Sequence, residues 1–125
     1  ILFVNCKNLI EVQESSFQAC YKLRKFQCKK LSKVGKNAFF LCYSLLLIDV
    51  ENVIELNEQC FANCYSIACH TYNKLKSLQS SSYGHNSTVQ ITGYNLINYD
   101  HQNPNIIGKD KLKKGILPNK YQEVL

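Results

Sequence analysis

The sequence has few of the residues and motifs on which catalysis depends. It contains only five glycines and two prolines among 125 residues, and it has no glycine-rich phosphate-binding loop. A paired-carboxylate signature and the His-Glu-x-x-His motif of zinc proteases are also missing. A nucleophilic cysteine would need an activating base and a cleft, and no pattern in the chain indicates either. We therefore predict that the protein is not an enzyme and that it uses no cofactor and no metal.

The sequence also lacks a hydrophobic run long enough to cross a membrane. Its longest nearly apolar stretch, residues 38–48, has 11 residues, whereas a membrane helix needs roughly 20. The chain does not begin with methionine, and its opening ILFV is too short for a signal peptide and lacks the basic flank. We interpret the chain as a fragment of a longer one, so that any targeting signal lies outside it.

The composition indicates one folded domain. Hydrophobic residues make up 46% of the chain, enough for one ordinary core. The 15 basic residues outnumber the nine acidic ones and give a formal net charge of +6, which favours acidic partners. Seven cysteines are an odd number for a secreted protein, and in a reducing compartment all of them could be small buried residues.

The dominant feature is a repeat of 22 residues, in which hydrophobic residues return to the same positions. The first position holds Ile1, Leu23, Leu45, Ile67 and Val89. Three later positions hold Val4, Phe26, Ile48, His70 and Thr92; Cys6, Cys28, Val50, Tyr72 and Tyr94; and Leu9, Leu31, Val53, Leu75 and Ile97. An amphipathic helix would instead show a period of about 3.6 residues.

The second half of each repeat has an aromatic residue followed, three residues later, by a cysteine. The aromatic column is Phe17, Phe39, Phe61 and Tyr83, and the next is Cys20, Cys42, Cys64 and Asn86. The pattern predicts an α/β-type repeat solenoid, a leucine-rich repeat with one short parallel strand per coil of 22 to 23 residues. Short helical or 3-10 turns are expected on the side opposite the strands.

Residues 1–125 are expected to form a single solenoid of about five and a half coils, with residues 98–125 divergent. If one residue is inserted, the tail returns to phase, with Ile106 in the aromatic column and Lys109 in the cysteine column. Tyr121 and Val124 then take the later apolar columns. Both ends break inside a coil and expose unpaired strand edges, so we expect self-association, which sedimentation velocity would detect.

One segment carries a family resemblance. The stretch VGKNAFFLCYSL, residues 34–45, resembles the I-G-x-x-A-F-x-x-C-x-x-L signature of BspA-like leucine-rich repeat proteins of bacteria and parasitic protists. SSFQACYKL and NEQCFANCYSI resemble further copies, and ILPNKYQEV resembles the strand and turn of the same family. The resemblance extends over residues 1–97 and is weaker beyond them, where the chain departs from the pattern.

The resemblance implies a surface or secreted protein that binds host or matrix proteins and has no catalytic residues. The alternative is an intracellular scaffold with reduced cysteines in the cytoplasm. We expect seven free thiols in the freshly isolated protein if the second interpretation holds, and bridged cysteines would exclude it. The sequence does not name the ligand or the compartment.

Three groups of cysteines were weighed as chemical sites. Cys20, Cys42 and Cys64 repeat along an axis and do not converge on one point, so we predict buried thiols. Cys60, Cys69 and His70 occupy columns that point in different directions, so no shared metal is expected there. Cys6 and Cys28 stand at the same position of adjacent coils, and we predict that they are reduced.

The outward positions of the strands form the candidate protein-binding face, since solenoids bind partners on such surfaces. Its predicted residues are Arg24, Lys25, Gln27, Lys29, Lys30, Leu47, Asp49, Glu51, Asn73 and Lys74. A basic patch beside an apolar one suits a protein or an acidic glycan. Nucleic acid is not expected, because no aromatic residue interleaves the lysines to stack on bases.

Two smaller features were also interpreted. Tyr21, Tyr43 and Tyr65 form a column that either packs ring on ring or offers aromatic contacts to a partner. Asn86 begins a glycosylation sequon, but it stands in the column of the buried cysteines, which argues against modification.

Overall fold

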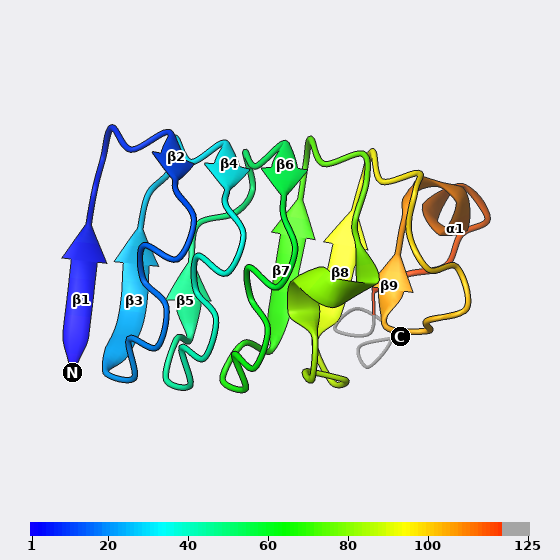
Figure 1. The fold of residues 1–125 in the computed structure, drawn as a ribbon. Helices are drawn as coiled ribbons and strands as arrows, with labels where there is room; N and C mark the ends of the chain where they lie inside the picture. The colour runs from blue at the N-terminus through cyan, green and yellow to red at the C-terminus, as the bar shows by residue number, and fades with distance from the viewer. Residues whose placement is uncertain (119–125) are drawn as a thin grey trace.

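The computed structural model describes residues 1–118, and these form a right-angled stack of short coils without long helices. In Figure 1 the strands β1, β3, β5, β7, β8 and β9 stand side by side along the axis of the stack. Their bounds are Leu2–Asn5, Leu23–Gln27, Leu47–Ile48, Cys69–Tyr72, Gln90–Gly93 and Ile106–Ile107. They pair in parallel as β1-β3-β5 and as β7-β8-β9. The predicted solenoid with short parallel strands is therefore confirmed.

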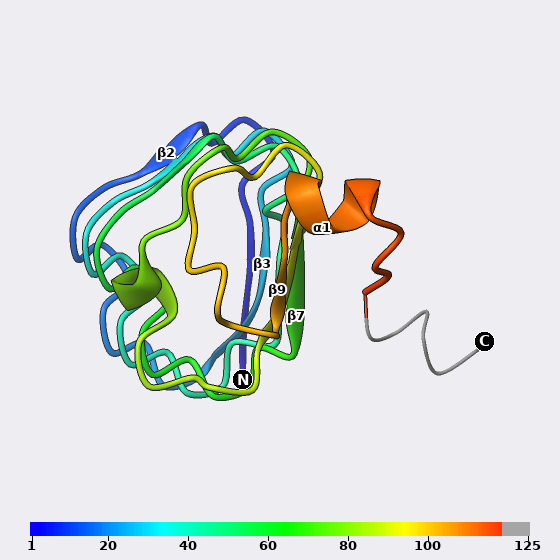
Figure 2. The same cartoon turned by 90° about the vertical axis from the view of Figure 1, so that its right-hand side faces the viewer.

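A second parallel sheet runs along another side of each of the first coils. Its strands are β2 (Glu11–Val12), β4 (Lys33–Val34) and β6 (Glu55–Leu56), in the order β2-β4-β6. Figure 2 looks along the stack and shows these strands at a corner away from β3, β7 and β9. The sequence analysis predicted one strand per coil and did not predict this second sheet.

The pairing register follows the 22-residue period through the first three coils. Lys25 pairs with Leu47 and Phe26 with Ile48, and in the second sheet Lys33 pairs with Glu55. Parallel strands at this spacing place equivalent side chains directly above one another. The columns inferred from the sequence are therefore real columns of atoms in this part of the chain.

The core is built from these columns. The first-position leucines Leu23 and Leu45 are fully buried, and so are Phe39 and Phe61 of the aromatic column. The rings of Phe17, Phe39 and Phe61 stack in parallel with centroids 5.5 Å apart at each step. Burying one such ring contributes roughly 1.5–3 kcal/mol relative to leaving it exposed, so the aromatic column is a main source of stability.

The turns that carry the aromatic column are held by backbone hydrogen bonds between coils. The amide groups of Ser15, Phe17 and Ala19 donate to carbonyl groups of the next coil at 2.7–3.0 Å. The pattern repeats from the second coil to the third. These turns use left-handed backbone conformations at residues that are not glycine, with φ of 57° at Ser15 and 59° at Ala19. A 3-10 helix occurs at Ser80–Tyr83.

The register predicted for the fifth coil is wrong by one residue. His70 pairs with Ile91 and not with Thr92, and Tyr72 pairs with Gly93. Leu96 is consequently buried at 0% exposure, whereas Ile97 is 54% exposed. Glycine is required at position 93, because a Cβ there would lie 2.5 Å from the Cβ of Leu96.

The phase proposed for the tail is also wrong. Ile106 lies in β9 and pairs with Ile91, and so belongs to the strand side and not to the aromatic column. Lys109 begins a short helix, α1 (Lys109–Lys113), which packs beside β9. The physical reason is that the fifth coil is shorter than the others, so counting in steps of 22 overshoots. Tyr121 and Val124 lie outside the described residues.

Candidate protein-binding face

The strand face of the first three coils brings together side chains that the sequence analysis selected. Lys25 stands between Phe3 and Leu47 in the pairing register, and Gln27 stands beside Asn5. Leu47 is 55% exposed and Phe3 is 65% exposed. This part of the face therefore alternates apolar and basic groups across neighbouring strands.

The basic residues gather at the carboxyl ends of β1 and β3. Lys7, Lys29 and Lys30 line a shallow hollow of about 390 Å³, together with Asn5, Gln27 and Cys28. We call these six residues the lysine hollow. Its floor includes the buried Cys28, while the three lysines are exposed at its rim. The Lys30 ammonium group donates a hydrogen bond to Asn8 Oδ1 at 3.3 Å, which fixes it on this edge.

Two predicted contact residues have roles within the fold. Asp49 Oδ2 accepts a hydrogen bond from the amide of Cys28 at 2.8 Å, so its carboxylate ties the third coil to the second. The Glu51 carbonyl accepts from the amide of Asn73 at 3.1 Å, which continues the stack to the fourth coil. Burial, with the nearby Asp49 charge, raises the pKa of Cys28 to about 12. Both acidic side chains are half-buried.

Asn73 and Lys74 follow β7 and are exposed, but they lie two coils away from the lysine hollow. Arg24 is exposed on β3, and Lys25 is half-buried. The lysine hollow thus collects Gln27, Lys29 and Lys30 from the predicted set. The sequence analysis missed Phe3, which belongs to the column of Lys25 and Leu47 and could have been found by extending that column back one repeat.

The cysteine column is a structural feature. The Cys42 thiol donates to the carbonyl oxygen of Phe17 at 3.0 Å, and the Cys64 thiol donates to that of Phe39 at the same distance. Burial raises the pKa of Cys42 to about 11 and raises the pKa of Cys64 further. All seven cysteines are free thiols, and within residues 1–118 no three His, Cys, Asp or Glu side chains are placed to hold a metal ion.

His70 lies in the core, as its column predicted. Tyr83 places its hydroxyl group 2.5 Å from His70 Nδ1, and a short hydrogen bond joins the hydroxyl groups of Tyr83 and Tyr72. Burial lowers the pKa of His70 to about 3, so the imidazole is neutral. Cys69 is exposed on the strand and Cys60 is buried, so the three residues do not share a site.

The remaining candidates are also placed. Tyr21, Tyr43 and Tyr65 stack on the surface with ring centroids 5.2 and 5.7 Å apart. Asn86 is buried, and its side-chain amide donates to the carbonyl of Cys64 at 2.9 Å. A glycan on that nitrogen would break the hydrogen bond. Of the two charged columns, Lys36 and Glu58 form an ion pair at 3.4 Å.

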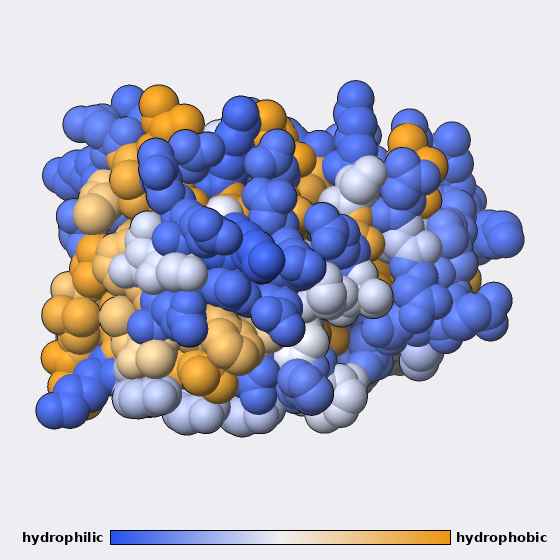
Figure 3. All heavy atoms as spheres, in the orientation of Figure 1, coloured by the Kyte–Doolittle hydropathy of each residue, from blue (hydrophilic) through white to orange (hydrophobic). Residues whose placement is uncertain are grey.

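The surface differs between the two ends of the molecule. Figure 3 shows hydrophobic residues concentrated toward the N-terminal end and hydrophilic ones toward the C-terminal end. Ile1 is 88% exposed and Leu2 is 45% exposed beside the outer edge of β1. Among the described residues no helix has the length and hydrophobicity needed to cross a bilayer.

Fold, repeat and surface together define a leucine-rich repeat solenoid. The family model of the BspA-type leucine-rich repeat region, in six copies, matches residues 3–99. The chain therefore belongs to the BspA-type leucine-rich repeat family. No curated protein and no solved structure matches it. Membership of this family indicates a repeat module for protein interaction, of a kind that typically serves as a non-catalytic binding scaffold.

Proposed function

We propose that the chain is a non-catalytic module that binds an acidic segment of a host or matrix protein and so contributes to adhesion at a cell surface. The lysine hollow is the observation that carries this proposal. Three lysines surround one depression on an otherwise ordered strand face, and Leu47 and Phe3 lie beside it as apolar contacts. Such a mixture of charge and exposed apolar area suits a protein partner.

The charges of the face also orient the partner. Lys7, Lys29 and Lys30 lie over the first two coils, whereas Asp49 and Glu51 follow β5 in the third coil. An acidic segment is attracted to the first two coils and repelled from the third. Each exposed ion pair contributes little by itself, about 0.2–1 kcal/mol. The apolar neighbours must supply the remainder, and the charges set the orientation and the rate of encounter.

A binding screen with matched variants tests the proposal. The wild type and the triple variant Lys25→Glu, Lys29→Glu, Lys30→Glu are measured against immobilised matrix proteins and heparin by biolayer interferometry. We expect the variant to bind its protein partner at least about tenfold more weakly, with a loss that diminishes at high salt. A heparin response without any protein response would overturn the choice of a protein as partner.

The control reverses three exposed lysines that lie away from the hollow, Lys22, Lys76 and Lys109. It alters the net charge by the same amount as the test variant. If both variants lose affinity equally, binding depends only on overall charge and the assignment to the hollow is wrong.

An intracellular scaffold is the second candidate, and the seven free thiols support it. Disulfides are common in small secreted domains and rare in the cytosol. Titration of the native protein with a thiol reagent after rapid isolation separates the two functions, because disulfides would exclude the cytosolic one. Self-association through the open edge of β1 stays a prediction.

A further inference from the structure

The fifth coil of the solenoid is cut short. Ile91 of β8 pairs with Ile106 of β9, so only 15 residues separate equivalent positions on these strands, from 91 to 106. In Figure 2 the chain between β8 and β9 crosses the inside of the outline that the earlier coils trace. The fifth coil therefore lacks the outer turn that carries the aromatic residue in each of the first four coils.

The aromatic column consequently ends at Tyr83. The ring of Phe61 stacks on that of Tyr83 with centroids 5.4 Å apart, and the opposite face of Tyr83 has no successor in the fifth coil. Phe39 and Phe61 are 0% exposed, whereas Tyr83 is 6% exposed. Its hydroxyl group is hydrogen-bonded in the core to Tyr72 and His70, so Tyr83 offers its ring and not its hydroxyl group.

A pocket occupies the place of the missing residue. Its volume is about 210 Å³, and Tyr83, Val89, Ile91 and Ile106 line its apolar part. His85 and Asp100 are among the polar residues that complete it. A cavity of about 150 Å³ lined by apolar side chains holds benzene, so this pocket has room for one six-membered aromatic ring. The tyrosine column ends here too, since Ser87 stands 22 residues after Tyr65 and also lines the pocket.

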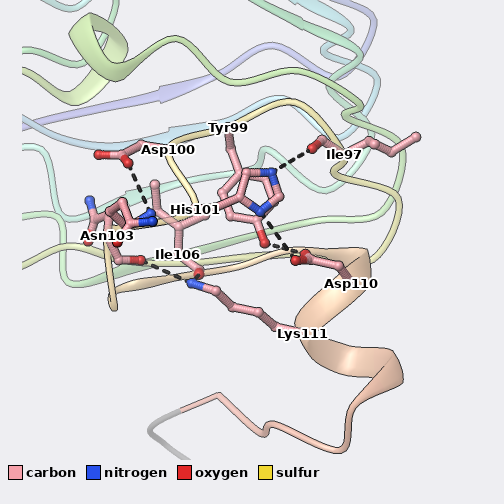
Figure 4. Close-up of polar contacts among 9 residues, drawn as sticks. Ile97, Tyr99, Asp100, His101, Asn103, Ile106, Asp110 and Lys111 are labelled. Atoms are coloured by element: carbon pink, nitrogen blue, oxygen red, sulfur yellow. Dashed lines mark hydrogen bonds and ion pairs between the residues drawn. The ribbon is translucent and has the colours of Figure 1, made fainter.

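The loop that closes the pocket is fixed from behind, as Figure 4 shows. His101 Nδ1 lies 3.2 Å from Asp110 Oδ2, and the Tyr99 hydroxyl group donates to Asp110 Oδ1, which lowers the pKa of that carboxyl group. The Lys111 ammonium group donates to the carbonyl oxygens of Asn103 at 3.2 Å and Ile106 at 2.7 Å. These contacts hold the loop to α1, so the pocket is preformed and binding need not order the loop.

We propose that this pocket binds one aromatic side chain, a tyrosine or a phenylalanine, of a partner protein. The inserted ring stacks on the free face of Tyr83 and continues the column by one step, with Val89, Ile91 and Ile106 around it. Offset stacking at this spacing is the arrangement that aromatic pairs prefer. The inference rests on the proposed function as a protein-binding module, but it places a second contact away from the lysine hollow.

The direct test uses small probes on the unmodified chain. We expect p-cresol, the side chain of tyrosine, and toluene, that of phenylalanine, to bind with dissociation constants on the order of 1 mM, as ligands of this size do. Proton NMR should show contacts from the probe ring to the methyl groups of Val89, Ile91 and Ile106. The matched probe 4-methylcyclohexanol should bind at least about fivefold more weakly, because it cannot stack. Equal binding of the two alcohols, or contacts elsewhere, would overturn the proposal.

A pocket-filling variant gives the second test. Ile106→Phe places a ring in the pocket and should abolish p-cresol binding, whereas Ile54→Phe, at an exposed site in the third coil, should leave it unchanged. If Ile106→Phe does not fold, the NMR contacts of the unmodified chain still decide. The charge-reversed variant of the lysine hollow should bind p-cresol normally. Failure at the pocket is thereby separated from failure of the proposed function.

Discussion

The second and third coils differ from the fourth in how they fill the same columns. In the earlier coils the inward positions hold Phe26, Cys42 and similar residues with exposures of 0–1%. In the fourth coil the corresponding positions hold His70, Tyr72 and Asn86, which are equally buried but polar. Both solutions support the same backbone, with the same turns and strands.

The difference shows what a column requires. The cysteine column needs a small group that can donate to a carbonyl oxygen, and Cys42 donates to Phe17. Asn86 meets the need differently, donating to the carbonyls of Cys64 at 2.9 Å and Ile67 at 3.3 Å. A polar residue is therefore tolerated in this core wherever its hydrogen bonds are made, as is general for buried polar groups.

The sharpest way to test the regular coils is to remove a ring from the aromatic column. Phe39→Ala should lower the free energy of unfolding by about 3–5 kcal/mol, because it leaves a cavity between Phe17 and Phe61. Urea denaturation followed by circular dichroism measures the effect. Tyr21→Ala, which removes an exposed stacked ring, is the control and should cost no more than about 1.5 kcal/mol. Similar losses for the two variants would contradict the assignment of the core.

The fourth coil should reveal itself through acid sensitivity. His70 has a pKa of about 3 in the fold and about 6.5 when unfolded. Between these values the unfolded chain binds the extra proton, so stability is complete above pH 6.5 and falls by about 1.4 kcal/mol per pH unit below it.

The measurement compares urea midpoints of the wild type and His70→Leu from pH 7 to pH 4. Subtracting the two curves removes the titration of Asp110 and of the exposed histidines. The variant should lose less stability on acidification, and a difference that is flat with pH would show that His70 is not the buried titrating group.

The smallest effect concerns the turns, where the first coils use residues ill-suited to a left-handed backbone. Ala19→Gly should raise the free energy of unfolding by about 0.5–1 kcal/mol, because φ is 59° at this position. Ala38→Gly, at a buried residue outside the left-handed set, is the matched control and should lower it. Thermal denaturation of both variants checks the signs, and destabilisation by both would rule out strain at residue 19.

The 22-residue period was sufficient to predict the solenoid and most of the core. Phe39, Leu45 and Cys64 lie where their columns placed them, because parallel stacking converts sequence period into spatial alignment. The second sheet was not predicted, since Glu11, Lys33 and Glu55 show charge alternation and no recognisable strand pattern over two residues. The slip at Ile91 was missed because a residue lost from one turn leaves no local signal.

The candidate surfaces were less predictable than the core. Exposure of Arg24, Lys29 and Lys30 followed from the alternation of the strand. The engagement of Asp49 with the Cys28 amide did not, because it depends on a side chain reaching from one coil to the next. The pocket beside Tyr83 exists only because the fifth coil is short, and a fixed period carries no information about where the period stops.

The burial of the cysteines also has a consequence for labelling chemistry. Thiol reagents attack the thiolate, and burial raises the pKa of Cys60 to about 12 and that of Cys42 to about 11. Cys69 is the cysteine classed as fully exposed, and it stands on the strand face next to Gln90. A maleimide dye should therefore react there first. The molecule thus carries its own attachment point for a fluorescent reporter on the strand face.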